Sequence, residues 1–297
     1  MKNILDRLRS KFSARPVADS TTQSSFAVSF AKRTTFASKL FLKVDRRVRF
    51  VASALILGFL MLISTFFPFS FTWILVPLLV GATFLFTYFS ILEGIDGIEW
   101  VMLFVMPVIF TLALYFFYYL FPVRWLTRIP FVVIYVISIY AILLTSNIFN
   151  VGVEKSLQLY RAAFAVNYFY QTVVMFLLFN TLFSLKAHFW VNGVGVGLLT
   201  IPLGMQFLWT IRLKLEIEPE AVAYSLCLAL IMAEFAVIAS FVPFEASVVA
   251  LVLTSIYYSI GGLFYSHIDQ RFFRETVRGY LFIMAFILAL AFLSLSW

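Results

Sequence analysis

The sequence predicts an all-α fold: a polytopic transmembrane helical bundle of about nine spans, preceded by a basic N-terminal arm. The first observation is composition, because 63% of the 297 residues are hydrophobic and only 12% are charged, whereas a soluble domain has about 25% charged residues. The second is that apolar stretches long enough to cross a bilayer recur from residue 50 onward. The third is charge, since residues 1–49 hold 12 Lys or Arg against three acids in a chain of net charge +8. Lipid is therefore the expected solvent of most of the chain.

Residues 1–49 are expected to form a cytoplasmic arm. Within the arm, residues 3–12 (NILDRLRSKF) predict an amphipathic helix, because their apolar side chains share one face and their basic side chains lie outside it. Such a helix binds an anionic membrane surface, and residues 18–25 (ADSTTQSS) predict a flexible linker after it. We therefore expect anionic lipid or an acidic partner to bind the arm. Nucleic acid is not expected, because no aromatic interleaving or recognised nucleic-acid-binding fold accompanies the charge.

From residue 50 the chain predicts nine helical spans, because backbone groups in lipid must be satisfied within their own segment. The predicted spans are 50–67, 71–92, 100–121, 131–149, 162–185, 190–211, 221–241, 246–268 and 279–296. The connection between the first two, PFS at 68–70, is very short. A re-entrant hairpin or a single broken element is therefore an alternative for this pair.

Aromatic residues and prolines support these boundaries. All six tryptophans fall at span ends or in a connecting segment, as an interfacial belt requires. Three prolines lie inside spans, where each is expected to kink its helix: Pro77, Pro107 and Pro202. Five others are expected to mark junctions, because proline cannot continue a helix: Pro68, Pro122, Pro130, Pro219 and Pro243.

The basic residues predict the orientation. Beyond the arm, seven fall on the side of the N-terminus and three on the other: Lys155, Arg161, Arg212, Lys214, Arg271, Arg274 and Arg278 against Arg124, Arg128 and Lys186. Since basic residues concentrate on the cytoplasmic side, we expect a multi-pass inner-membrane protein with a cytoplasmic N-terminus. An odd number of spans then puts Trp297 outside.

Two local patterns predict packing and a linker. The sequence GVGVG at 193–197 has glycines four residues apart within an apolar run, which favours close approach of two helices over a nucleotide-binding loop. Residues 211–218 (IRLKLEIE) alternate apolar and charged residues, which predicts an extended interfacial linker rather than continued helix.

Glu234 is the first candidate site, because it is the only acid well inside a predicted span. A charged carboxylate in lipid costs several kcal/mol, so we expect it to face protein or water, or to be protonated. The small residues Ala223 and Cys227 on its helical stripe predict a face packed on another helix. Either a neutral carboxyl joins helices there, bonded to Thr254, Ser255 or Tyr257, or Glu234 carries a proton or cation or binds a substrate.

A second candidate is a polar cluster on the inner side: Asn147, Asn150, Arg161, Asn167 and Gln171. All are expected within about three helical turns of the inner boundary. One interpretation is a pocket that holds an anionic headgroup or a phosphate. The other is a snorkelling arginine beside amides that join helices.

The third candidate lies in the connection after the second span. Glu93, Asp96 and Glu99 recur every three residues in EGIDGIEW, with no basic residue among them. Such oxygen ligands could hold Mg²⁺ or Ca²⁺, but a solvated acidic loop has the same composition. No cofactor motif is present, and no catalytic residue is assigned.

Several stretches together carry a resemblance: ILEGIDGIEW, YAILLTSNIFNV, SLQLYRAA and LLFNTLFSL. They resemble a domain-of-unknown-function family of polytopic integral membrane proteins from small-genome candidate-phyla bacteria. The resemblance covers residues 50–297 and implies an inner-membrane protein, without implying an activity, a ligand or catalytic residues.

Three functions are compatible with these patterns. The leading one is a non-enzymatic interaction or assembly component, with unspecified protein partners. The first alternative is a secondary transporter of a small solute with Glu234 as its proton- or cation-linked group. The second is a metal-dependent lipid-modifying membrane enzyme that uses the acidic connection.

Overall fold

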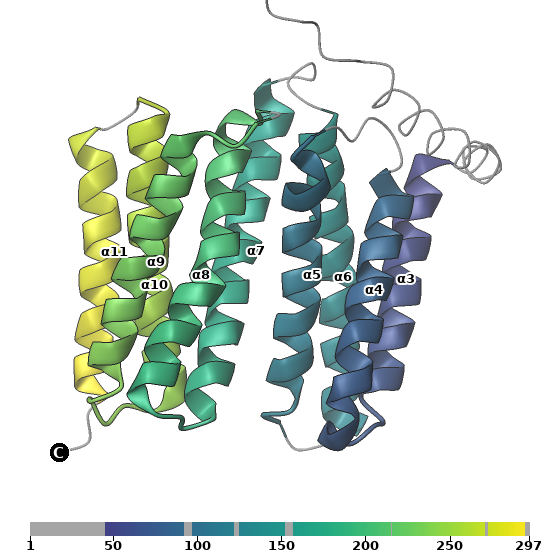
Figure 1. Cartoon of the computed structure of the whole chain (residues 1–297), viewed down its shortest axis with the longest axis horizontal. Helices are drawn as coiled ribbons and strands as arrows, with labels where there is room; N and C mark the ends of the chain where they lie inside the picture. The colour runs from purple at the N-terminus through teal and green to yellow at the C-terminus, as the bar shows by residue number, and fades with distance from the viewer. Residues whose placement is uncertain are drawn as a thin grey trace, which may run out of the picture. The chain divides into compact units, whose positions relative to one another are not determined.

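The computed structural model describes residues 45–91, 97–121, 125–151, 157–214, 216–270 and 273–294. Within these ranges nine helices are long and apolar enough to cross a membrane, and no strand is present. They are α3 (Arg46–Ser64), α4 (Thr72–Ile91), α5 (Glu99–Tyr118), α6 (Trp125–Asn150), α7 (Leu157–Ser184), α8 (Phe189–Arg212), α9 (Pro219–Ala239), α10 (Ala246–Ile268) and α11 (Arg274–Leu293) (Figure 1). The prediction of an all-α, nine-span fold is confirmed. The predicted arm helix at 3–12 and the linker at 18–25 lie outside the described residues.

The short first connection joins two complete spans. α3 has 19 residues and α4 has 20, so each is nearly 30 Å long at about 1.5 Å per residue. Between them Pro68 precedes a single 3₁₀ turn, Phe69–Phe71, and the helices run side by side in opposite directions (Figure 1). The alternatives of a re-entrant hairpin and of one broken element are therefore wrong.

Three helices begin five or six residues before the predicted spans. α6 starts at Trp125, α7 at Leu157 and α11 at Arg274. Their first turns contain polar or charged residues, so a boundary predicted from hydropathy falls several residues after the true start of each helix. Pro130 consequently lies inside α6 and does not mark a junction as predicted. The hydrogen bond that Pro130 cannot donate would have ended on a carbonyl of the first turn.

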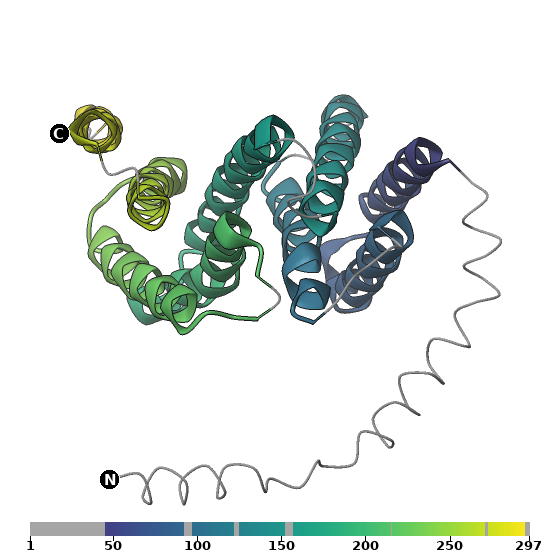
Figure 2. The ribbon, with the colours of Figure 1, turned by 90° about the horizontal axis from the view of Figure 1, so that it is seen from above.

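The helices pack mainly with neighbours in sequence, and α5 and α7 join the two halves of the helical unit. α5 contacts α4, α6, α7 and α8, while α10 contacts α7, α9 and α11. Seen from above, α11 lies at the far edge of the arrangement, beside α10 (Figure 2). Ala291 is its only buried residue, and 6% of its apolar window is buried against 56% for α10.

α8 and α9 approach closely through glycine. A Cβ added at Gly193 would lie 2.6 Å from Val237 Cγ2, and one at Gly197 would lie 3.3 Å from Ala233 Cβ. Ordinary side chains at these positions would push the two helices apart. The packing interpretation of GVGVG is confirmed, and it fixes the helix pair that carries the sites below.

Charged side chains gather at one end of the helices. We call the end that carries residues 212–218 the basic end, and the end that carries residues 185–188 and 240–245 the opposite end. The helix bounds place these described residues at the basic end: Arg47, Arg49, Arg161, Arg212, Lys214, Arg274 and Arg278. Arg128 and Lys186 lie at the opposite end.

Candidate functional site

A buried amide network lies between α7 and α8. Gln171, fully buried, donates from Nε2 to Leu203 O at 2.5 Å and to Gln206 Oε1 at 3.1 Å. Asn167 and Gln206 exchange two longer contacts, at 3.3 and 3.5 Å. The four-residue spacing of Asn167 and Gln171 puts both amides on the α8 side of α7. They therefore join two helices inside the apolar region.

Gln206 was missed by the sequence interpretation. It is 2% exposed and contributes to all three side-chain contacts of the network. The signal available in the sequence was an amide inside an otherwise apolar span, six residues before Arg212. An uncharged amide departs less from the apolar pattern of a span than the carboxyl of Glu234 does, although both need a hydrogen-bonding partner in lipid.

The predicted inner cluster does not form one pocket. Of its five residues, the structure joins Asn167 and Gln171 only. Arg161 is exposed, and neither its side chain nor that of Asn147 bonds to another described residue. The start of α7 is tied to the end of α8, because Tyr160 OH donates to the carbonyls of Thr210 at 2.6 Å and Ile211 at 3.0 Å, and the Tyr160 ring also contacts Phe149 of α6. Asn150 likewise stays at the end of α6.

Glu234 points away from the helical unit. Its side chain is exposed and makes no hydrogen bond or ion pair with any described residue. The stripe expected to pack is exposed as well, with Leu230 at 63%, Ile238 at 61% and Cys227 on the surface, so that expectation is wrong. Two of the small residues of α9 that meet α8 are Ala229 and Ala233, which face the glycines of α8.

The expected hydrogen bonds from Glu234 to α10 are absent. Thr254 Oγ1 and Tyr257 OH are buried without a partner among the described residues, and Ser255 donates to the carbonyl of Val252. Glu234 instead borders a shallow outward groove of about 460 Å³, lined by Trp190, Gly193, Val194, Ala233, Glu234, Val237 and Ile238. It lies five residues before the end of α9, or about 7.5 Å at 1.5 Å per residue. Trp190, which marks interfacial depth, shares the groove.

Of the acidic connection, the structure describes Glu99 only. Glu99 opens α5 and is 8% exposed, whereas Glu93 and Asp96 lie outside the described residues. Among the residues that the structure does describe, no group of three His, Cys, Asp or Glu could hold a metal ion. The predicted Mg²⁺ or Ca²⁺ site therefore stays a prediction.

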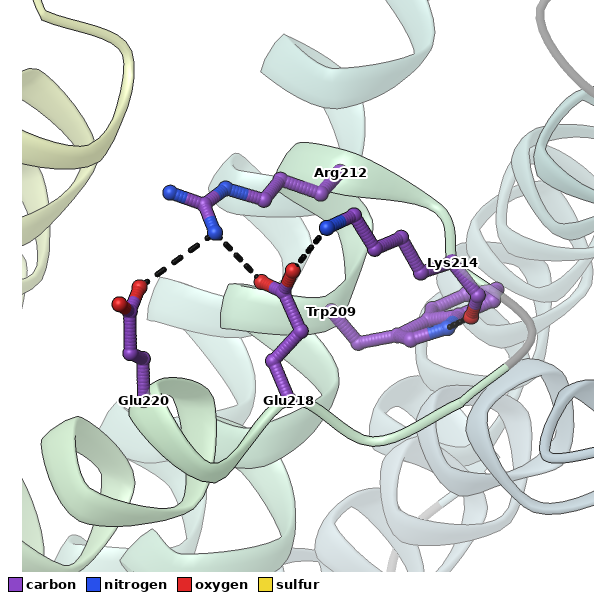
Figure 3. A network of polar contacts seen from close by, with 5 residues as sticks. All are labelled: Trp209, Arg212, Lys214, Glu218 and Glu220. Atoms are coloured by element: carbon purple, nitrogen blue, oxygen red, sulfur yellow. Dashed lines mark hydrogen bonds and ion pairs between the residues drawn. The ribbon is translucent and has the colours of Figure 1, made fainter. Parts of the chain in front are cut away.

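Ion pairs close the basic end of α8 and α9. Arg212 contacts Glu218 at 2.6 Å and Glu220 at 3.4 Å, and Lys214 also pairs with Glu218 (Figure 3). Trp209 Nε1 donates to the Lys214 carbonyl at 2.8 Å, which holds the linker back against α8. The lysine, and then the arginine, hold the pKa of the Glu218 carboxyl below its usual value.

The predicted extended linker at 211–218 is confirmed in part. α8 continues through Arg212, Leu213 takes a left-handed conformation at φ 48°, and α9 begins at Pro219. The ion pairs around this linker leave a cavity of about 20 Å³ beside Trp209. That is room for about one water molecule.

The chain matches no family model, no curated protein and no solved structure. The functional proposals below therefore rest on geometry and chemistry alone.

Proposed function

We propose that this protein is a non-enzymatic interaction component of a cytoplasmic membrane, which binds the transmembrane helix of a partner on the outward face of α9. In this proposal the basic end and residues 1–49 face the cytoplasm, and Trp297 lies outside. The gathering of described basic side chains at the basic end supports this orientation.

One observation carries the proposal: Glu234 is exposed on an apolar outward face and has no partner among the described residues. In a bilayer that face meets lipid, where an unpaired carboxyl is unfavourable. A partner helix with a lysine, an arginine or an amide in the outer third of the bilayer would supply the missing donor. The shallow groove beside Glu234 offers an apolar seat of about 460 Å³ for such a helix.

The same observation favours an interaction component over a carrier. A proton-linked carrier needs its acid on a path between helices, whereas Glu234 faces outward beside Ile238. The amides Asn167 and Gln171 support helix packing by bonding to α8.

The test uses a designed transmembrane peptide. The purified protein is reconstituted in phosphatidylcholine vesicles with a leucine–alanine helix that carries one lysine in its outer third, and association is followed by energy transfer. We expect this peptide to bind about tenfold more tightly than its all-leucine counterpart, because interhelical polar contacts contribute about 1–2 kcal/mol. Glu234→Leu is expected to remove the difference.

The control is Glu216→Gln, which changes an exposed acid in the linker at the basic end and should leave peptide binding unchanged. Equal binding of the lysine and leucine peptides to the wild-type protein would refute the proposal. A lysine preference that persists in Glu234→Leu would refute the role of this carboxyl.

The orientation and the arm are tested separately. In a Cys227→Ser background, single cysteines at Ser70 and Glu216 should react with an impermeant reagent from opposite sides. Removal of residues 1–45 should weaken binding to vesicles that contain phosphatidylglycerol and leave binding to neutral vesicles unchanged. Labelling of both cysteines from one side would overturn the topology.

A further inference from the structure

A pocket of about 650 Å³ opens at the opposite end of the helical unit, beside the turn from α7 to α8 and the turn from α9 to α10. Its lining combines apolar and polar side chains. Phe183 and Val249, 9% and 3% exposed, belong to the buried core. Ser184, Asn192 and Ser240 supply hydrogen-bonding groups, and Lys186 and Glu245 supply charge.

Asn192 has a buried acceptor without a donor. The residue is 4% exposed, and its Nδ2 donates to Ser240 Oγ at 3.0 Å and to Ala187 O at 3.5 Å. The carbonyl of Ala187 accepts only, and Ser240 already donates to Ala236 O, so the amide is oriented with Nδ2 toward both. Its Oδ1 is then left buried with no partner among the described residues. An orphaned acceptor of this kind is unfavourable.

The two charges of the pocket are not paired. Lys186 and Glu245 are exposed, and neither makes an ion pair or a side-chain hydrogen bond with a described residue. Lys186 takes a left-handed conformation at φ 50°, where the α7–α8 turn reverses the chain, and Glu245 precedes the first turn of α10. One pocket is thus lined by an unpaired ammonium and an unpaired carboxylate above an apolar floor.

We propose that this pocket binds a small zwitterion: a primary ammonium that donates to the Glu245 carboxylate, and an anionic group that pairs with Lys186. The apolar floor suits an attached hydrocarbon. Two sources share this chemistry, the headgroup of phosphatidylethanolamine and a free apolar amino acid. Phosphatidylcholine is also zwitterionic, but its quaternary ammonium has no N–H to donate, so it distinguishes hydrogen bonding to Glu245 from charge alone.

The experiment uses the full-length protein in phosphatidylcholine nanodiscs and two arms. One arm replaces part of the lipid by phosphatidylethanolamine and measures retained lipid by native mass spectrometry. The other titrates free leucine by calorimetry. We expect saturable binding in at least one arm, and the arm that binds identifies the source.

Two variants are matched to the pocket. Lys186→Gly removes the ammonium at a left-handed position that glycine adopts readily, so the protein should stay folded while binding weakens roughly tenfold or more. Glu245→Gln keeps the size of the side chain and should weaken binding similarly. Glu216→Gln, at the other end of α9, should bind like wild type. Absence of saturable binding in both arms, or binding that neither pocket variant weakens, would overturn the proposal.

Discussion

The two ends of the α8–α9 pair differ in how they treat charge. At the basic end, Arg212 and Lys214 pair with Glu218, and about 20 Å³ of space remains. At the opposite end, Lys186 and Glu245 stay apart around an open pocket of about 650 Å³. The same two helices form both ends, so the difference comes from the segments that connect them to each other and to their neighbours. It teaches that one helix pair can have paired charges at one end and unpaired charges around a pocket at the other.

The largest expected effect comes from disrupting the contact between α8 and α9 near the opposite end. Gly193→Ala puts a Cβ 2.6 Å from Val237 Cγ2, whereas Gly204→Ala meets Leu228 at an ordinary 3.5 Å. Overpacking costs about 1–3 kcal/mol, and alanine favours helix by up to about 1 kcal/mol at both sites. Gly193→Ala should therefore be less stable than Gly204→Ala by about 1–3 kcal/mol in unfolding by denaturing detergent. Equal stabilities would mean that α8 and α9 separate freely near the pocket.

A second variant tests the buried amide network that joins α7 to α8. Gln206→Ala removes one of the two acceptors of Gln171 Nε2 and both contacts of Asn167. We expect a loss of about 1 kcal/mol of unfolding free energy, since interhelical polar contacts in bilayers are of that order. The matched change Gln158→Ala, at an exposed amide on α7, should alter stability by less than about 0.5 kcal/mol. Similar losses in both variants would argue against the network.

A third comparison replaces by glycine two residues in the left-handed conformation, one after α7 and one after α8. Lys186 at φ 50° and Leu213 at φ 48° both occupy backbone conformations that favour glycine. Lys186→Gly should raise the unfolding free energy by up to about 1 kcal/mol. Leu213→Gly should gain less, because Leu213 also packs against the core. A thermal melt of each variant in the same detergent measures the difference, and a larger gain for Leu213→Gly would contradict it.

The smallest expected effect is the pH dependence of the stability that the ion pairs at the basic end contribute. Pairing lowers the pKa of Glu218 in the folded protein, so its stabilising contribution is present above the unfolded pKa and is lost as the pH falls through the folded value. The melting temperature of the wild type should exceed that of Glu218→Gln at about pH 7, and the gap should close by about pH 3. High salt should narrow it at neutral pH, because the pair is exposed. A gap that widens in acid would show that another group is responsible.

The sequence predicted the spans well and the faces poorly, and the physical reason is the same for both. Hydropathy identifies segments that lipid accepts, which is why each of the nine described helices overlaps a predicted span. Since lipid and protein interior are both apolar, hydropathy cannot distinguish the side of α9 that packs on other helices from the side that faces lipid. The stripe through Cys227, Leu230 and Glu234 was therefore assigned to packing, although it faces outward.

The sequence also could not predict the roles of residues whose partners lie on other helices or turns. Gln206 has meaning only because Gln171 lies opposite it on another helix. The pocket at the open end depends on two turns about 55 residues apart, and the orphaned oxygen of Asn192 depends on a serine in the second turn. No periodicity within one segment records such a pairing. The left-handed conformation of Lys186, a residue without glycine's freedom, left no signal in the sequence either.

The position of α11 has a consequence for how the protein is made. Its contact with α10 centres on Gly262 and Tyr280, with one hydrogen bond from Ser259 to the Tyr280 carbonyl at 3.2 Å. A helix that its neighbours cover so little must partition into the bilayer on its own hydropathy as it leaves the translocon. A chain whose synthesis stops before Arg274 should therefore already be able to assemble the other eight helices described here. α11 would then join the edge of the bundle last, with most of its surface still exposed.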